Sequence, residues 1–314
     1  MTPSSVDTRS TVDCTLVVNI GPRDFEMALT TIPHMIRSHK VAFARTLLVI
    51  DRTPPSGRIA GPSAKMNADT FTQAIGDATP GSTIQMLGRE LVTRRRINNE
   101  WFGRSDVTDR CASGTPIYPF VFGIDGAATE FILHADCDML FHDPGNPSWI
   151  EEGMRILETE PDIIFVNQMM GPRSDSVSEP EFLAPFDLGR QLRLAKTFST
   201  RCFLLQRKKL RHFLPLQSVT YPLHRRILYG IQQRSPFLPL ERMVANQLAL
   251  TGTFRCDLTA SYGFTVHAGD KSWFSGNSEH IETVIREIEV GRYARSQIGH
   301  INLTDSSGPC GLTP

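Results

Sequence analysis

The first part of the chain alternates between short apolar runs and segments with helical spacing, and this alternation strongly constrains the fold. Residues 14–20 form a β-branched run that stops at a Gly-Pro pair, and residues 46–50 form a second apolar run. Between them, residues 25–39 carry apolar side chains at the spacing of an amphipathic helix. A helix over 66–78 and a strand over 83–87 repeat the pattern. Strand, helix, strand, helix, strand predicts a doubly wound, mostly parallel sheet with helices on both faces.

The remaining sequence continues this α/β pattern and ends in an amphipathic helix over 279–296. We expect an irregular, arginine-rich excursion over 91–116, because that stretch is polar and weakly periodic. The other elements are expected as strands over 131–135, 162–167, 197–205, 254–259 and 263–267, and as helices over 118–125, 149–160, from 207 and over 239–252.

No long linker or internal repeat divides the chain, so we expect a single domain. Its predicted parts are a flexible leader (1–13), a nucleotide-binding half (about 14–140), an acceptor-binding half (about 141–300) and a loose tail (301–314).

Composition excludes several classes of protein. The 314 residues have a formal net charge of zero, so no global positive field favours nucleic acid or an anionic membrane. The run Arg94 to Arg96 is expected to be a solvated loop rather than a phosphate contact. The six cysteines form no C-x-x-C pair, which suits a reducing cytosol. The leader lacks the apolar core of a secretory signal, and no apolar stretch is long enough to span a bilayer. We therefore expect a soluble, cytoplasmic protein without a transmembrane segment.

The most informative motif is Asp136-Cys137-Asp138, at the end of the predicted strand over 131–135. In an extended chain the two carboxylates point to one side and the cysteine points away. Carboxylates this close repel each other unless a cation lies between them, and their hard oxygens suit Mg²⁺ or Mn²⁺. Ligands of open α/β sheets bind at the carboxyl ends of the strands, where this pair falls. A solvated turn is the alternative interpretation, because Asp-x-Asp is common.

The order of these parts resembles the A-type fold of nucleotide-sugar-dependent glycosyltransferases, most closely family 2, over roughly residues 14 to 270. The resemblance places the Asp-x-Asp pair at that family's metal motif. It implies that Asp138 ligates a divalent cation directly and that Asp136 contacts the ribose or the metal through water. It also places Asp51 where an acid reads the nucleotide base, although a turn or cap acid would look the same. The first loop would touch the nucleotide through Asn19, Gly21 and Arg23.

Glu241 is the candidate general base. Inverting members of the family often open such a helix with an acidic pair, and Glu241 falls on the second position, whereas Leu240 replaces the first acid. A carboxylate in the first helical turn is favoured by the helix dipole and can take a proton from an acceptor hydroxyl. A solvent-facing glutamate at the helix start is the alternative.

The segment Thr265 to Ser272 resembles the place where many A-type enzymes carry a histidine after the last core strand. His267 would then complete the metal shell as a neutral imidazole. Lys271, in an adjoining flap, would offset the charge of the pyrophosphate.

The resemblance implies a metal-dependent transferase of the hexosyl or N-acetylhexosaminyl class. It would move a sugar from a nucleoside-diphosphate donor, which we expect to be UDP-linked, to a soluble acceptor. The transfer would proceed with inversion, and Mn²⁺ or Mg²⁺ would be the cofactor. A homo-oligomer is compatible with the sequence. The alternatives are a retaining enzyme of the same fold, a sugar nucleotidyltransferase, a phosphohydrolase and a non-catalytic binding module.

Overall fold

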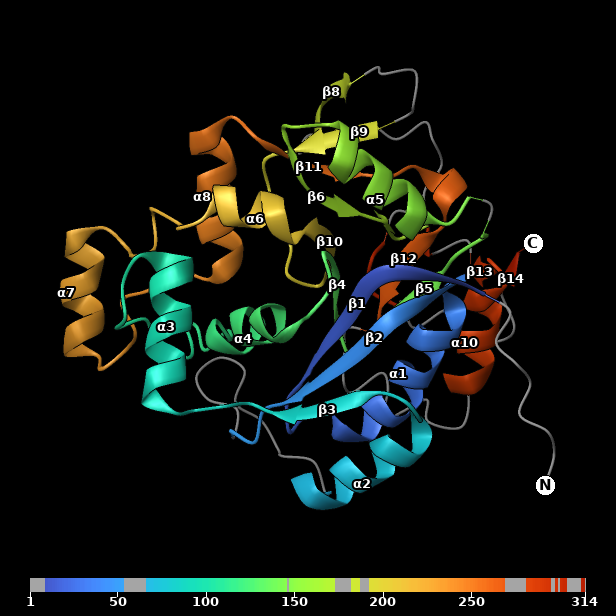
Figure 1. The fold of residues 1–314 in the computed structure, drawn as a ribbon, viewed down its shortest axis with the longest axis horizontal. Coiled ribbons are helices and arrows are strands. Elements are labelled where there is room, and N and C mark those ends of the chain that lie inside the picture. Colours follow the sequence, from blue (N-terminus) through green and yellow to red (C-terminus); the bar gives the residue numbers. More distant parts are fainter. Residues whose placement is uncertain are drawn as a thin grey trace.

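The fold is built on one large sheet. The computed structural model describes residues 9–53, 66–145, 147–172, 182–186, 192–268, 281–294, 297–298, 300–303 and 312–313. Within these residues, a nine-stranded sheet has the order β3-β2-β1-β4-β10-β6-β11-β9-β8 (Figure 1). The strands are β1 (Ser10–Ile20), β2 (Val41–Ile50), β3 (Thr83–Met86), β4 (Phe131–Asp136), β6 (Ile163–Asn167), β8 (Phe182–Phe186), β9 (Leu192–Ala195), β10 (Cys202–Gln206) and β11 (Phe254–Asp257).

Most strands of this sheet run in one direction. β1 pairs in parallel with β2 and β4, β2 with β3, and β6 with β11. β10 lies antiparallel between β4 and β6, and β9 lies antiparallel between β11 and β8. Because parallel strands need crossovers, the helices connect them above and below the sheet. The doubly wound, mostly parallel α/β fold predicted from the sequence is confirmed.

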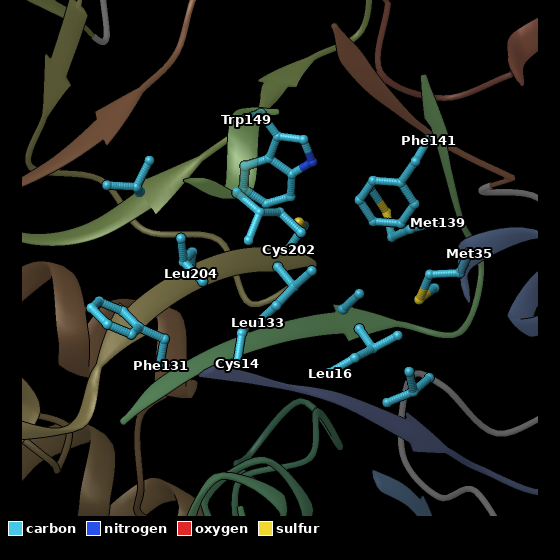
Figure 2. Packing of buried hydrophobic residues seen from close by; sticks show 14 of the residues in the cluster. Cys14, Leu16, Met35, Phe131, Leu133, Met139, Phe141, Trp149, Cys202 and Leu204 are labelled. Atoms are coloured by element: carbon cyan, nitrogen blue, oxygen red, sulfur yellow. The ribbon is translucent and has the colours of Figure 1, made fainter. Parts of the chain in front are cut away.

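Helices cover both faces of the sheet, so its strands are apolar on both sides. On β1, Leu16 and Val18 point into one core and Val17 points into the other. In Figure 2, Leu16 of β1, Leu133 of β4 and Trp149 of α5 lie together in the first core. That core lies under α1 (Phe25–Ser38), α2 (Ala68–Ala78) and α5 (Trp149–Thr159), and the second lies under α3 (Leu91–Phe102), α4 (Tyr118–Gly126), α6 (Arg207–Phe213) and α8 (Leu240–Thr251).

A small second sheet stands beside the carboxyl end of β4. Its strands, in the order β5-β12-β7, are β5 (Met139–His142), β12 (Phe264–His267) and β7 (Met169–Met170). The helix α10 (Ile281–Glu289) packs its apolar side chains onto this sheet in a third core. The elements not yet named are α7 (Leu223–Ile231), the short helix η2 (Ala260–Tyr262), and the paired strands β13 (Tyr293–Ala294) and β14 (Leu312–Thr313).

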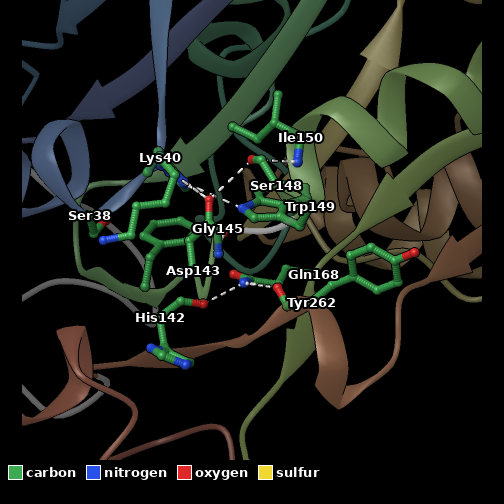
Figure 3. Close-up of polar contacts among 12 residues, drawn as sticks. Ser38, Lys40, His142, Asp143, Gly145, Ser148, Trp149, Ile150, Gln168 and Tyr262 are labelled. Atoms are coloured by element: carbon green, nitrogen blue, oxygen red, sulfur yellow. Dashed lines mark hydrogen bonds and ion pairs between the residues drawn. The ribbon is translucent and has the colours of Figure 1, made fainter. Parts of the chain in front are cut away.

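Buried polar contacts join the small sheet to the rest of the molecule (Figure 3). The Asp143 carboxylate accepts hydrogen bonds from the backbone N–H groups of Lys40 and Gly145 and from the Ser148 hydroxyl, at 3.3, 2.9 and 3.2 Å. The Gln168 amide donates to the carbonyls of His142 and Tyr262, at 2.6 and 2.8 Å. The Gln168 bonds hold the ends of β5, β7 and β12 together, and the Asp143 bonds tie the end of β5 to the segments before β2 and α5.

Gly263 permits the close approach of β12 to β5. Its φ is +84°, and a Cβ at this position would lie 2.0 Å from the carbonyl oxygen of His142. Any larger residue would therefore push β12 away from its neighbour.

Several expectations about local structure need correction. The amphipathic helix expected over 279–296 ends at Glu289, and Tyr293–Ala294 forms strand β13. β1 begins at Ser10, so residues 10–13 belong to the sheet and not to a leader. Residues 91–102 of the expected irregular excursion form helix α3, because Ile97, Trp101 and Phe102 bury one of its faces. The strand expected over 197–205 begins only at Cys202, and helix α7 was not predicted. Residues 301–303 of the expected tail are bonded to His267 of β12.

Candidate functional site

A cavity of about 320 Å³ opens where β1, β2 and β4 end. A volume of this size lies at the lower end of the range for small-molecule sites. Most of the site residues predicted from the sequence line it: Asn19, Gly21, Arg23, Asp51, Asp136 and Asp138. These residues are far apart in the sequence, and they meet here because parallel strands end at one edge of the sheet.

Asp136 ends β4, and its Cα pairs with that of Asn19 on β1. Burial and the neighbouring charge of Asp138 raise the pKa of Asp136 well above its usual value. Asp24, in the loop before α1, also lines the cavity and raises this pKa further. The site thus concentrates acidic groups, and a cation would relieve their mutual repulsion.

His267 and Asp138 face each other across the start of the small sheet. The His267 Nε2 lies 2.9 Å from Oδ2 of Asp138, and its Nδ1 lies 3.0 Å from Oδ1 of Asn302. The register of β12 against β5 brings them together, since His267 pairs with Met139 and the N–H of Ala268 donates to the carbonyl of Asp138. Burial lowers the pKa of His267, but the hydrogen bond and charge of Asp138 outweigh it and the net shift is upward.

The residues present suit a divalent cation by their chemistry. Asp136 and Asp138 supply carboxylate oxygens, and His267 supplies an imidazole nitrogen. Among the described residues, however, no three His, Cys, Asp or Glu side chains converge closely enough to hold a metal ion by themselves. A cation here would therefore need oxygens from a ligand or from water, which is how Mg²⁺ is commonly bound.

Asp51 lies at the end of β2 and is buried. Its Oδ1 accepts hydrogen bonds from the N–H of Thr53 at 2.8 Å and from Arg89 at 3.2 Å, and its Oδ2 accepts one from Arg110 at 3.2 Å. Arg110 also lines the cavity. The predicted base-reading acid is therefore in place, but it is already paired with two guanidinium groups.

Of the residues predicted for the first loop, Asn19 lies near the end of β1 and Arg23 lies on the loop that follows. Neither amide atom of Asn19 has a hydrogen-bond partner among the described residues, and both atoms are buried. A buried amide without partners is costly, so a ligand that bonds to it would bind more tightly. Lys271 lies outside the described residues.

Glu241 is in the first turn of α8, as predicted. Its Oε1 accepts hydrogen bonds from the N–H and the hydroxyl of Thr200, at 3.3 and 3.1 Å. Thr200 lines the cavity, so Glu241 lies one hydrogen bond away from the cavity wall.

Three functional candidates were missed by sequence reasoning. Thr200 holds Glu241, Arg110 holds Asp51, and Asp24 adds a further negative charge near Asp136. All three lie outside the helices and strands, and nothing in the local sequence distinguishes Thr200 or Arg110. Only the position of Asp24, four residues after the end of β1, gave a signal.

Comparisons with known proteins gave likenesses of structure only. No protein-family model and no curated protein matches the sequence. The structure of GalNAc-T7 with UDP, GalNAc and Mn²⁺ is similar at 7% identity and a TM-score of 0.49, over 81% of this chain and 42% of that one. Glucosyl-3-phosphoglycerate synthase from Mycobacterium tuberculosis, in complex with Mg²⁺ and UDP, is similar at 12% identity and 0.39, over 90% and 80%.

The galactosyltransferase LgtC, with donor and acceptor sugar analogs, is similar at 10% identity and a TM-score of 0.38, over 78% of this chain and 73% of that one. This chain therefore spans less than half of the GalNAc-T7 structure and about three quarters or more of the other two. Among the described residues, no helix is both long and apolar enough to cross a bilayer.

Proposed function

We propose that the protein is a metal-dependent glycosyltransferase that uses a nucleoside-diphosphate sugar. The observation that carries the proposal is the pair Asp136 and Asp138 in the wall of the cavity where β1, β2 and β4 end, with Nε2 of His267 2.9 Å from Oδ2 of Asp138. These donor types suit a Mg²⁺ or Mn²⁺ ion whose remaining ligands are phosphate oxygens. When bound, such an ion would neutralise the diphosphate as it leaves.

The chain's own residues divide the remaining work. The amide of Asn19 and the pair of Asp51 with Arg110 line the part of the cavity nearest β1 and β2, where a nucleoside would lie. Asp51 offers a charged acceptor to an imide N–H, and Arg110 offers donors to a carbonyl oxygen, which suits uracil. We therefore infer a UDP-linked donor.

Glu241 acts as the general base. It takes the proton of the acceptor hydroxyl, the acceptor oxygen forms a bond to the anomeric carbon, and the bond from that carbon to the diphosphate breaks. This direct displacement inverts the anomeric centre. The two hydrogen bonds from Thr200 hold the Glu241 carboxylate in a fixed position.

The test is to incubate the purified protein with UDP-sugars and Mn²⁺, without and with candidate soluble acceptors, and to measure UDP release. Glu241→Gln should lower turnover by about 10²–10⁴-fold and leave UDP binding unchanged. Glu282→Gln is a matched control, because Glu282 occupies the first turn of α10 in the same way.

The outcomes separate the alternatives. A small loss of rate in Glu241→Gln would favour a retaining mechanism, and release of pyrophosphate from a nucleoside triphosphate would favour a nucleotidyltransferase. Failure of the folded protein to bind any nucleotide sugar would overturn the proposal.

A further inference from the structure

Helix α7 lies on an arm, residues 222–236, that projects from the body of the protein at the far side of the molecule from α10 (Figure 1). Two backbone hydrogen bonds close the base of the arm: Tyr221 N–H to the Pro236 carbonyl at 3.0 Å, and Leu238 N–H to the Val219 carbonyl at 2.9 Å. The arm is thus held at its root. None of the nine residues of α7 is buried.

The apolar face of α7 points away from the protein. Leu223, Ile227 and Ile231 recur at every fourth residue, which places them on one side of the helix. They are 67%, 57% and 78% exposed, and Leu228 beside them is 49% exposed.

The opposite side of the helix is the one that touches the body. The Tyr229 ring packs edge-on against the Tyr221 ring, with centroids 5.1 Å apart. The Arg225 guanidinium lies 5.9 Å from the centre of the Tyr221 ring. A surface helix normally buries its apolar stripe against its own protein. On α7 the arrangement is the opposite: the apolar stripe faces solvent and the other side of the helix faces the protein.

The low intrinsic stability of helix α7 is a second reason to expect that its apolar stripe is covered by another surface. An isolated helix of this length is marginal in water, and α7 gains little packing from the body beyond Tyr229. Burial of its four exposed apolar side chains would stabilise the helix as well as the contact.

The charge of the arm indicates what covers it. Residues 222–236 contain three arginines and one histidine and no acidic residue, although the whole chain has a net charge of zero. At the root of the arm, Arg225 and Arg242 of α8 line one groove together with His224. Two copies meeting through this face would bring like charges together, whereas an anionic lipid surface would attract them.

We propose that α7 is a docking element for the surface of an anionic lipid bilayer. Its apolar stripe would enter the boundary between headgroups and acyl chains, and the arginines would contact lipid phosphates. The inference is independent of the proposed transferase activity. A net charge of zero for the whole chain is compatible with this docking, because the charge that attracts the lipid surface is local to the arm.

The arm adjoins the candidate site. Tyr229, Gln233 and Arg234 of the arm line a second cavity, whose other wall includes Arg110. Since Arg110 also borders the site cavity, docking through α7 would bring the site close to the lipid surface.

The test is co-sedimentation of the full chain with vesicles. One set contains phosphatidylglycerol and phosphatidylcholine, and the other contains phosphatidylcholine alone. We expect binding to the mixed vesicles that falls as salt is raised, and little binding to the neutral ones. Ile227→Asp should reduce the bound fraction by at least about tenfold, because it places a charge in the apolar stripe.

Leu250→Asp is the matched control, since Leu250 is 61% exposed on α8 and outside the arm. Arg226→Gln should weaken binding to mixed vesicles by about fivefold. Circular dichroism and thermal unfolding verify that each variant is folded. The proposal is overturned if the wild type ignores both vesicles, if Ile227→Asp binds as well as the control, or if the arm mediates only dimers or contacts with another protein.

Discussion

The Nε2 of His267 lies 2.9 Å from Oδ2 of Asp138, although 129 positions separate the two residues along the chain (267 − 138). The antiparallel register of β12 against β5 creates this contact. It places an imidazole nitrogen beside a carboxylate oxygen of Asp138, and Asp138 lines the same cavity as Asp136.

Asp138→Asn should abolish metal-assisted nucleotide binding. The substitution removes the anionic oxygen that faces His267, so we expect the affinity for UDP in the presence of Mn²⁺ to fall by at least about a hundredfold. Isothermal titration calorimetry measures the change. Asp77→Asn, on the exposed face of α2, is the control. Removal of the metal with EDTA should reduce the wild type to the level of the variant. Equal affinities with and without Mn²⁺ would contradict the prediction.

Thr200→Val should lower turnover while the KM for the donor stays unchanged. The substitution removes the hydroxyl that donates to Glu241 and leaves the backbone N–H in place. A hydrogen bond to a charged group contributes about 1.5–3 kcal/mol, so a loss of roughly 10–100-fold in kcat is expected. The measurement is UDP release at several donor concentrations. Thr200→Ser retains the hydroxyl and should restore the rate. If the serine variant is as slow as the valine variant, the hydroxyl does not position the base.

Gly263→Ala should destabilise the fold more than Gly81→Ala. The two glycines have nearly the same backbone conformation, with φ of +84° and +86°, but the new Cβ meets a carbonyl oxygen at Gly263 and open space at Gly81. We expect a loss of about 2–5 kcal/mol in the free energy of unfolding for Gly263→Ala. For Gly81→Ala we expect about 1–2 kcal/mol. Urea unfolding of both variants measures the difference, and equal losses would show that the close approach of β12 to His142 costs nothing.

Stability should fall as the pH is lowered from about 7.5 to about 5.5, partly because of His39. Burial, together with the charges of His34 and Arg9, lowers the pKa of His39 to about 3. The folded protein therefore keeps this ring neutral while the unfolded chain takes up a proton below about pH 6.5. The contribution is present above that pH and is lost as the pH falls toward 3, by about 1.4 kcal/mol per pH unit.

Urea unfolding of the wild type and of His39→Gln at several pH values tests this prediction. The ring contacts the indole N–H of Trp149, 3.3 Å from Nδ1, and the Asp143 carboxylate, 4.0 Å from Nδ1. The aromatic rings of Phe43 and Phe141 also pack against it. The glutamine variant can keep an acceptor for Trp149 but cannot titrate. Its stability should depend less steeply on pH, and an unchanged dependence would exclude His39 as the source.

Sequence reasoning was successful where the signal was local. Continuous apolar runs predicted β1, β2, β4 and β6, because strands of a parallel sheet are buried on both faces. Acidic residues at strand ends and in a helical first turn predicted Asp51, Asp136, Asp138 and Glu241 as candidates, and the structure places all four in the cavity wall or one hydrogen bond from it. Their chemical roles remain predictions.

It failed where packing decided the outcome. The segment of helix α3 was expected to be irregular, because it has too few apolar residues to show a clear helical period. Its buried residues face one side of the helix only because they pack into the second core. The division into nucleotide- and acceptor-binding halves was not tested and stays a prediction.

The amino-acid sequence by itself determined the succession of strands and helices and the positions of the acidic residues along it. Side-chain alternation and strand ends depend only on near neighbours in the chain, so they can be read without a partner. The tertiary structure alone decided that His267 faces Asp138, that Thr200 holds Glu241, and that α7 turns its apolar side outward. These relationships join segments far apart in sequence, and strand register and packing, rather than local propensity, bring them together.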